Sequence, residues 1–329
     1  MGQLIKLQDY ISRYEQDVYR YPSQFVRLKH QQWEKLKAAY LAGELQNLFA
    51  GKEESDIEDD WIYQPKQALF TKVKGLFKKD RELENQYEIE GSSHQDDNIF
   101  SLHIPNSPDS MEDLKQTYLN QLLRFQMKWA SSTLHEKSVI DPAFYLDERL
   151  RFFLQRFPDT FLVLYKPVFL LKNAPVEVEV ILLSPTDAWC ITFLEAEEDA
   201  AFVGTNERFW LKRHHRYGDK KVLNPMLALN RMEKIVTQVF TLYEVNLPIK
   251  KVILSRNGYI DYPLVPFDTL LLDKRSFPEW FQRMRNLSSP LKHLQLKAAQ
   301  ALLDYCDTAS NRRLEWDVDA DGGEDLIDR

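Results

Sequence analysis

Four glutamates occupy positions that suit a metal site for phosphodiester chemistry. Glu148 lies on a predicted helix, Glu179 begins the apolar half of a predicted strand, and Glu195 and Glu197 end the next strand. Residues two apart on a strand point to the same face, so we expect Glu195 and Glu197 together, with Glu179 nearby. Converging carboxylates bind Mg²⁺ or Mn²⁺, which polarises a phosphodiester and generates a hydroxide nucleophile. These four residues are the catalytic candidates, and Glu179 and Glu195 are the candidate metal ligands.

A basic stretch follows the same strand and is a second candidate site. Trp210 and Tyr217 flank it. Cations neutralise phosphates and aromatic rings stack on unpaired bases, so the stretch suits nucleic acid, although an exposed hairpin tip of ordinary charge is the alternative. His214 and His215 are not expected to share a metal ion, because adjacent strand residues point to opposite faces. The candidate nucleic-acid-binding residues are Lys212, Arg213, Arg216, Lys220 and Lys221.

The elements that must position these residues begin at residue 141. Asp141-Pro142 opens a helix, and Asn224-Pro225 opens another with apolar residues at helical spacing. Later helices are expected at 277–284 and from Ser289-Pro290. Apolar, β-branched runs predict strands at 160–165, 168–172, 176–184, 189–197, around Phe209–Leu211, 250–255 and 268–272. This order predicts an α/β domain whose mixed sheet is flanked by helices.

The order of these motifs resembles the nuclease-related domain (NERD) family of the PD-(D/E)XK, restriction-endonuclease-like superfamily. The resemblance covers about residues 142–286. It implies a restriction-endonuclease-like fold, and a site built from a helix acid, a strand acid and a Glu-x-Lys motif. The matching parts are EVILLSP at 179–185, CITFLEAE at 190–197, Gly204 and Trp210, Asn224-Pro225 and VILSRNGYI at 252–260.

The chain departs from the family pattern at its catalytic positions. Glu179 stands in place of the strand aspartate, and Glu197 stands in place of the lysine that orients water and offsets phosphate charge. Clustered carboxylates without a cation repel each other, unless a second metal or a lysine such as Lys172 or Lys212 compensates. We therefore expect a catalytically degenerate protein that binds nucleic acid or a protein partner. An active nuclease that uses Mg²⁺ or Mn²⁺ is the alternative.

Residues before 141 predict an N-terminal helical extension. Leu7, Ile11, Tyr14 and Val18 recur at helical spacing, and a second apolar face at 25–40 completes a helical hairpin over 1–50. A charged variable segment at 51–109 contains a predicted basic amphipathic helix at 66–81. Such a helix can lie on a membrane, so a membrane-surface adaptor is a further alternative function. The remaining expected divisions are a connecting helix at 110–140, the NERD-like domain at 141–288, a C-terminal helix at 289–310 and an acidic tail at 311–329.

The composition and the absence of certain motifs argue against several classes of function. The net charge is −7, which argues against non-specific nucleic-acid binding by the whole surface but permits a local basic groove. Cys190 and Cys306 form no CxxC pair, and no glycine-rich phosphate loop occurs, so neither a thiolate zinc site nor a nucleotide cofactor is expected. No apolar run is long enough for a transmembrane segment. We expect a bacterial protein of the cytoplasm with two reduced thiols.

Overall fold

The computed structural model describes residues 1–45, 108–133, 136–171 and 174–309. The chain divides into two compact units, Met1–His30 with Lys115–Arg329, and Gln31–Leu114. In the second unit, the described residues include the later part of α2 (Tyr21–Ala42) and the first residues of α4 (Met111–Trp129). The predicted basic helix at 66–81, Lys172 and the acidic tail at 311–329 lie outside the described residues, as does almost all of the segment 51–109. All the candidate site residues belong to the first unit.

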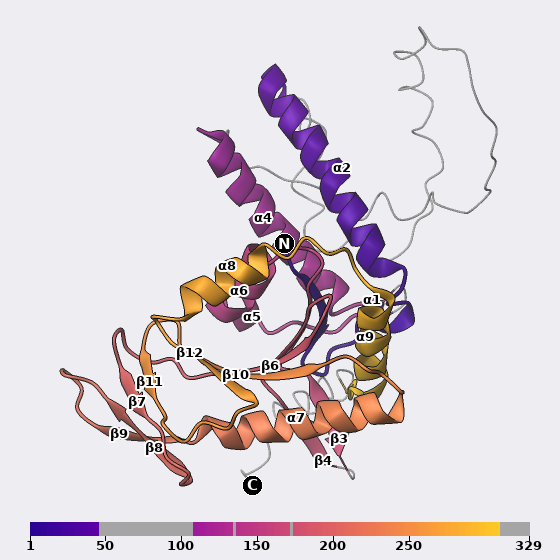
Figure 1. Ribbon diagram of the computed structural model, residues 1–329. Helices are drawn as coiled ribbons and strands as arrows, with labels where there is room; N and C mark the ends of the chain where they lie inside the picture. The colour runs from indigo at the N-terminus through magenta and orange to yellow at the C-terminus, as the bar shows by residue number, and fades with distance from the viewer. Residues whose placement is uncertain (46–107, 134–135, 172–173, 310–329) are drawn as a thin grey trace, which may run out of the picture. The chain divides into compact units, whose positions relative to one another are not determined.

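A mixed sheet of six strands forms the centre of the described part of the first unit, in the order β1-β2-β5-β6-β10-β12. Figure 1 labels β6, β10 and β12 of this sheet. β1 runs parallel to β2, the neighbours β2, β5 and β6 are antiparallel, and β6, β10 and β12 are parallel. The C-terminal ends of β6 and β10 therefore meet at one end of the sheet. The strands are β1 Gln3–Leu7, β2 Leu162–Tyr165, β5 Val180–Leu183, β6 Ala188–Phe193, β10 Ile249–Leu254 and β12 Thr269–Leu272.

Helices cover both faces of this sheet. On one face, Val252 and Leu254 join a buried cluster with Phe153 of α6 (Glu148–Arg156) and Trp280 of α8 (Phe277–Arg285). On the other face, the amine of Lys251 donates to the side chain of Asn230 on α7 (Pro225–Leu242). α9 (His293–Tyr305) packs beside α7 (Figure 1). Successive residues of β10 therefore contact helices on opposite faces of the sheet, as expected for a sheet that is buried on both faces.

A second sheet lies beside the N-terminal end of α7 (Figure 1). Its four strands run in the order β11-β7-β8-β9, in the described part of the chain. They are β7 Ala201–Val203, β8 Phe209–Arg213, β9 Lys220–Leu223 and β11 Tyr259–Asp261. The remaining elements are the hairpin of β3 (Val168–Leu171) and β4 (Ala174–Glu177), and the short helices α1 (Arg13–Gln16) and α5 (Ala143–Leu146).

Most of the predicted elements after residue 109 are confirmed. Ser110 caps α4 by accepting the backbone N–H of Asp113, and Asn224 caps α7 by accepting that of Met226. The run at 176–184 is two strands, β4 and β5, rather than one. The helix that follows Asp141-Pro142 is broken at Asp147, whose carboxylate caps α6.

The predicted helical hairpin over 1–50 is wrong in its first half. Residues 3–7 form β1, an edge strand of the central sheet, and only the second helix is confirmed, as α2. β1 is buried along its whole length, including Gln3 and Lys6. A segment buried on every side shows no alternation of apolar and polar residues, so the apolar spacing of the surrounding residues suggested a helix.

The first compact unit extends beyond residues 141–288. β1, most of α4 and α9 belong to the same compact unit as the predicted domain. Within the described residues, no helix has the length and apolar character needed to cross a bilayer.

Candidate functional site

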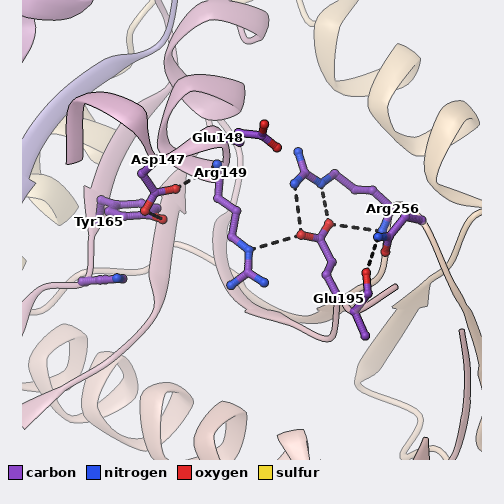
Figure 2. Close-up of a pocket in the computed structure, with 9 residues that line it drawn as sticks. Asp147, Glu148, Arg149, Tyr165, Glu195 and Arg256 are labelled. Carbon is purple, nitrogen blue, oxygen red and sulfur yellow. Dashed lines mark hydrogen bonds and ion pairs between the residues drawn. The ribbon is translucent and has the colours of Figure 1, made fainter. Parts of the chain in front are cut away.

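A charged cleft of about 630 Å³ opens at the end of the central sheet where β6 and β10 finish. Chain segments far apart in sequence form its walls: the start of α6, the end of β2, the loop after β6 and the loop after β10 (Figure 2). Its lining residues are Asp147, Glu148, Arg149, Tyr165, Lys166, Glu195, Ala196, Arg256 and Asn257.

Glu195 lies between two arginines in this cleft (Figure 2). The Nε and Nη2 atoms of Arg256 donate to its two carboxylate oxygens at 2.5 and 3.0 Å, the geometry of a bidentate pair. The backbone N–H of Arg256 and the Nε of Arg149 add contacts at 3.3 and 3.2 Å. A carboxylate offers about four lone-pair sites, so these contacts saturate Glu195.

Aromatic rings hold the two guanidinium groups in place. The guanidinium carbon of Arg149 lies 4.6 Å from the ring centroid of Phe193, and that of Arg256 lies 4.9 Å from that of Phe152. Such contacts favour a cation over the face of a ring. The arginines are therefore fixed from both sides, by Glu195 and by the rings, before any ligand binds.

The cleft presents more free donors than free acceptors. The terminal nitrogens of Arg149 and the amine of Lys166 make no hydrogen bond or ion pair with any described residue. The carboxylate of Asp147 is used as the cap of α6 and as the acceptor for the Tyr165 hydroxyl at 2.7 Å. Glu195 is saturated, which leaves the exposed Glu148 as the free carboxylate of the lining. Guanidinium and ammonium donors of this kind suit an anionic ligand.

Glu179 points toward β6 from the residue just before β5. Its Oε2 accepts the backbone N–H of Phe193 at 2.8 Å. Burial raises the pKa of Glu179 above its ordinary value, despite that hydrogen bond and the nearby charges of Arg149 and Lys166, which act in the opposite direction.

This shift predicts a pH-dependent effect of Glu179→Gln. Because the folded pKa is raised, ionised Glu179 destabilises the folded state once the pH exceeds the unfolded value near 4.5, and the full cost applies above the folded pKa. Glutamine keeps the acceptor and cannot ionise. The variant should therefore gain stability over the wild type as the pH rises from about 4 to about 8. Urea unfolding across this range measures the difference, and Glu148→Gln is the exposed control. A difference that is constant with pH would contradict the assignment.

Glu195 and Glu197 do not share a face, contrary to our expectation. β6 ends at Phe193, so the alternation of a strand no longer applies to either residue. Glu197 instead pairs at 2.5 Å with the largely buried amine of Lys212 on β8. The Lys212 hydrogen bond lowers the pKa of Glu197. Lys212, one of the two proposed substitutes for the missing lysine, therefore neutralises the glutamate that occupies the motif position.

The four candidate glutamates therefore do not converge. Glu148 lies on the rim of the cleft, Glu179 faces a backbone amide, Glu195 faces two arginines and Glu197 faces Lys212. No set of three or more His, Cys, Asp or Glu side chains within the described ranges has a geometry that could hold a metal ion. Mg²⁺ would have to displace both arginines from Glu195, so these residues do not fit the expected metal site.

The basic stretch forms the β8–β9 hairpin and the turn between its strands. Lys220 and Lys221 are exposed, as is Arg216, whereas Arg213 pairs with Asp219 at 3.7 Å on the surface. Lys212 is buried, so it is not available to a ligand as predicted. His214 holds the turn, because its Nδ1 accepts the backbone N–H groups of residues 216 and 217.

The aromatic residues of this hairpin also differ from the prediction. Trp210 is buried, and its indole N–H donates to the backbone oxygen of Thr205. Tyr217 is exposed, as expected, and Phe209 is the second exposed ring.

Sequence reasoning missed the residues that define the cleft. Arg149 and Arg256 were not candidates, and neither were Lys166 and Asn257. One signal was present: Arg256 and Asn257 come directly after the predicted strand at 250–255, and Glu195 lies near the end of the predicted strand at 189–197. Strand ends that meet at one end of a sheet are common ligand sites in open α/β folds.

The fold and site together define a mixed α/β protein with an arginine-clamped carboxylate in a charged cleft. A short stretch of the chain is similar to an RNA 2',3'-cyclic phosphodiesterase of Geobacillus stearothermophilus, with 64% identity over 42 residues. The match covers 13% of this chain, and the chain spans 13% of that protein. No family model and no solved structure matches the chain.

Proposed function

We propose that the chain is a catalytically degenerate, nuclease-related protein of the bacterial cytoplasm that binds nucleic acid without cleaving it. The observation that carries the proposal is the saturation of Glu195 by Arg149 and Arg256. A carboxylate engaged in this way organises cations and leaves the cleft with donors for phosphate. A nuclease of this type instead needs free carboxylates around a metal.

The order of elements supports a restriction-endonuclease-like core. α6 precedes three antiparallel strands, β2, β5 and β6, and α7 then leads to β10, which is parallel to β6. The helix acid, the strand acid and the Glu-x-Glu segment fall on or beside α6, β5 and β6, as the resemblance implies. The short match to a protein named as a phosphodiesterase is compatible with phosphodiester chemistry in a relative, but 42 residues do not carry the proposal.

Binding of labelled oligonucleotides tests the proposal. Lys166→Gln removes an unpaired cation from the cleft, so we expect weaker binding and a salt dependence that is shallower by about 0.7 in the log–log slope for a single strand. The measurement is fluorescence anisotropy at several salt concentrations.

Lys250→Gln is the matched control for this experiment. Lys250 is exposed and lies at the opposite end of β10 from the cleft, so the substitution removes the same charge far from the site. Equal losses for the two variants would show that overall charge, not the cleft, accounts for binding. No binding by the wild type would overturn the proposed function.

A further inference from the structure

The four-stranded sheet has one face that no described element covers. On β7, β8 and β11, the buried side chains lie on one face and are Phe202, Trp210, Lys212 and Ile260. Their neighbours along each strand are half-buried or exposed and therefore point to the other face. Apart from the strands themselves, no described helix or strand makes extensive contact with this sheet.

Strand register places the residues of the open face in rows. Phe209 pairs with Leu223 and Leu211 with Lys221 across β8 and β9, while Arg213 pairs with Ala201 on β7. Val203 and Tyr259 continue the face on β7 and β11. Asp261 of β11 pairs with Val203, so the face also carries one carboxylate. We use "open face" for Tyr259, Asp261, Ala201, Val203, Phe209, Leu211, Arg213, Lys221 and Leu223.

Phe209 is an unusual residue for such an exposed position. The residue is 46% exposed, and its cross-strand partner Leu223 is 54% exposed. The guanidinium carbon of Arg208 lies 5.6 Å from the ring centroid. The hairpin therefore exposes an aromatic ring with a cation beside it, and Lys221 lies one row away.

We propose that the open face binds single-stranded nucleic acid, with a base stacked on Phe209 and the backbone along the cations of the hairpin. Exposed rings on a sheet accept unpaired bases irrespective of sequence, and neighbouring basic side chains neutralise the phosphates. Lys221 lies on the face, and Arg208 and Arg216 lie at its edges. Arg213 also lies on the face and exchanges its exposed pair with Asp219 for a phosphate. Paired bases are not available for stacking, so this surface favours a single strand over a duplex.

This inference rests on the proposed function and narrows it to one class of nucleic acid. The open face is also linked to the cleft. The loop between β6 and β7 carries Glu195, which lines the cleft, and Glu197, which pairs with Lys212 of β8. A strand bound on the hairpin thus lies on an element that is anchored to the cleft loop.

The test compares Phe209→Ala with Phe267→Ala in the full-length protein. Both substitutions remove an exposed phenylalanine, but Phe267 lies outside the open face, in the segment before β12. Affinity for a labelled oligo(dT) 20-mer should fall about tenfold for Phe209→Ala and stay at the wild-type value for Phe267→Ala. Phe209→Trp should retain binding, and a duplex of the same length should bind the wild type more weakly than the single strand.

The outcomes separate this inference from the proposed function. If the wild type binds the single strand and Phe209→Ala binds equally well, the stacking surface is wrong and binding without cleavage stands. Preference for the duplex would also overturn the inference alone. If the wild type binds neither oligonucleotide, both proposals fail, and a protein partner becomes the occupant to seek for the apolar residues of the open face.

Discussion

Glu195→Gln should lower the free energy of unfolding by about 2–3 kcal/mol, because the substitution removes the charge that pairs with two arginines in a mostly buried position. The side chain of Glu195 is 10% exposed and accepts four hydrogen bonds. An amide accepts through one oxygen, and its NH₂ group would face guanidinium donors. Urea unfolding in the absence of divalent metal measures the change.

The sign of the change in the free energy of unfolding distinguishes an arginine-paired carboxylate from a carboxylate that ligates a metal. Where several carboxylates are clustered to ligate a metal, they repel each other without it, and removing one stabilises the metal-free protein. A gain in stability for Glu195→Gln would therefore contradict the arrangement described here. Glu148→Gln is the control, because Glu148 is an exposed carboxylate of the same cleft, and we expect a change within about 0.5 kcal/mol.

Glu15→Gln should have a larger effect, a loss of about 3–5 kcal/mol, because it leaves the charge of Lys6 buried without its carboxylate. Lys6 is fully buried in β1, and its amine is paired with Glu15. The same amine donates to the backbone oxygen of Tyr10 at 2.7 Å and to the hydroxyl of Thr308 at 2.8 Å. The pair thus holds β1, α1 and the segment after α9 together, and thermal or urea unfolding measures its loss.

A double substitution tests the cause of this effect. Lys6→Met with Glu15→Gln removes both charges, so it should recover a large part of the stability lost in Glu15→Gln alone. Asp159→Asn breaks the more exposed pair with Lys29 and should cost no more than about 1 kcal/mol. A double variant that is as unstable as Glu15→Gln would show that the lost energy is not that of an unpaired buried charge.

Helices and strands that are determined by residues close together in sequence could be predicted from the sequence. Asn224-Pro225 and the apolar residues that follow contain both the cap and the buried stripe of α7. β1 could not be predicted in this way, because its buried Lys6 is compensated by Glu15 and by Thr308, 302 residues further along the chain. The sequence of a short segment does not show that a residue distant in sequence will provide the hydrogen bonds or the opposite charge that a buried lysine needs.

Two of the four candidate glutamates, Glu148 and Glu195, line the cleft. The partners of Glu195 are 46 and 61 residues away in sequence, so its saturation by arginines depends on tertiary packing. The exposed ring of the hairpin was missed for a similar reason. Trp210 and Phe209 are adjacent, and contacts outside the strand, including that of Trp210 with Tyr262, determine which of the two is buried.

The most direct test of binding without cleavage follows both properties in one sample. A labelled single strand is incubated with the purified protein and Mg²⁺ or Mn²⁺, anisotropy records binding, and the same sample is then run on a denaturing gel beside one containing Glu195→Ala. We predict a bound, full-length strand, with an affinity that divalent metal does not increase. Cleavage by the wild type that is lost in Glu195→Ala would contradict the account and establish a metal-dependent nuclease.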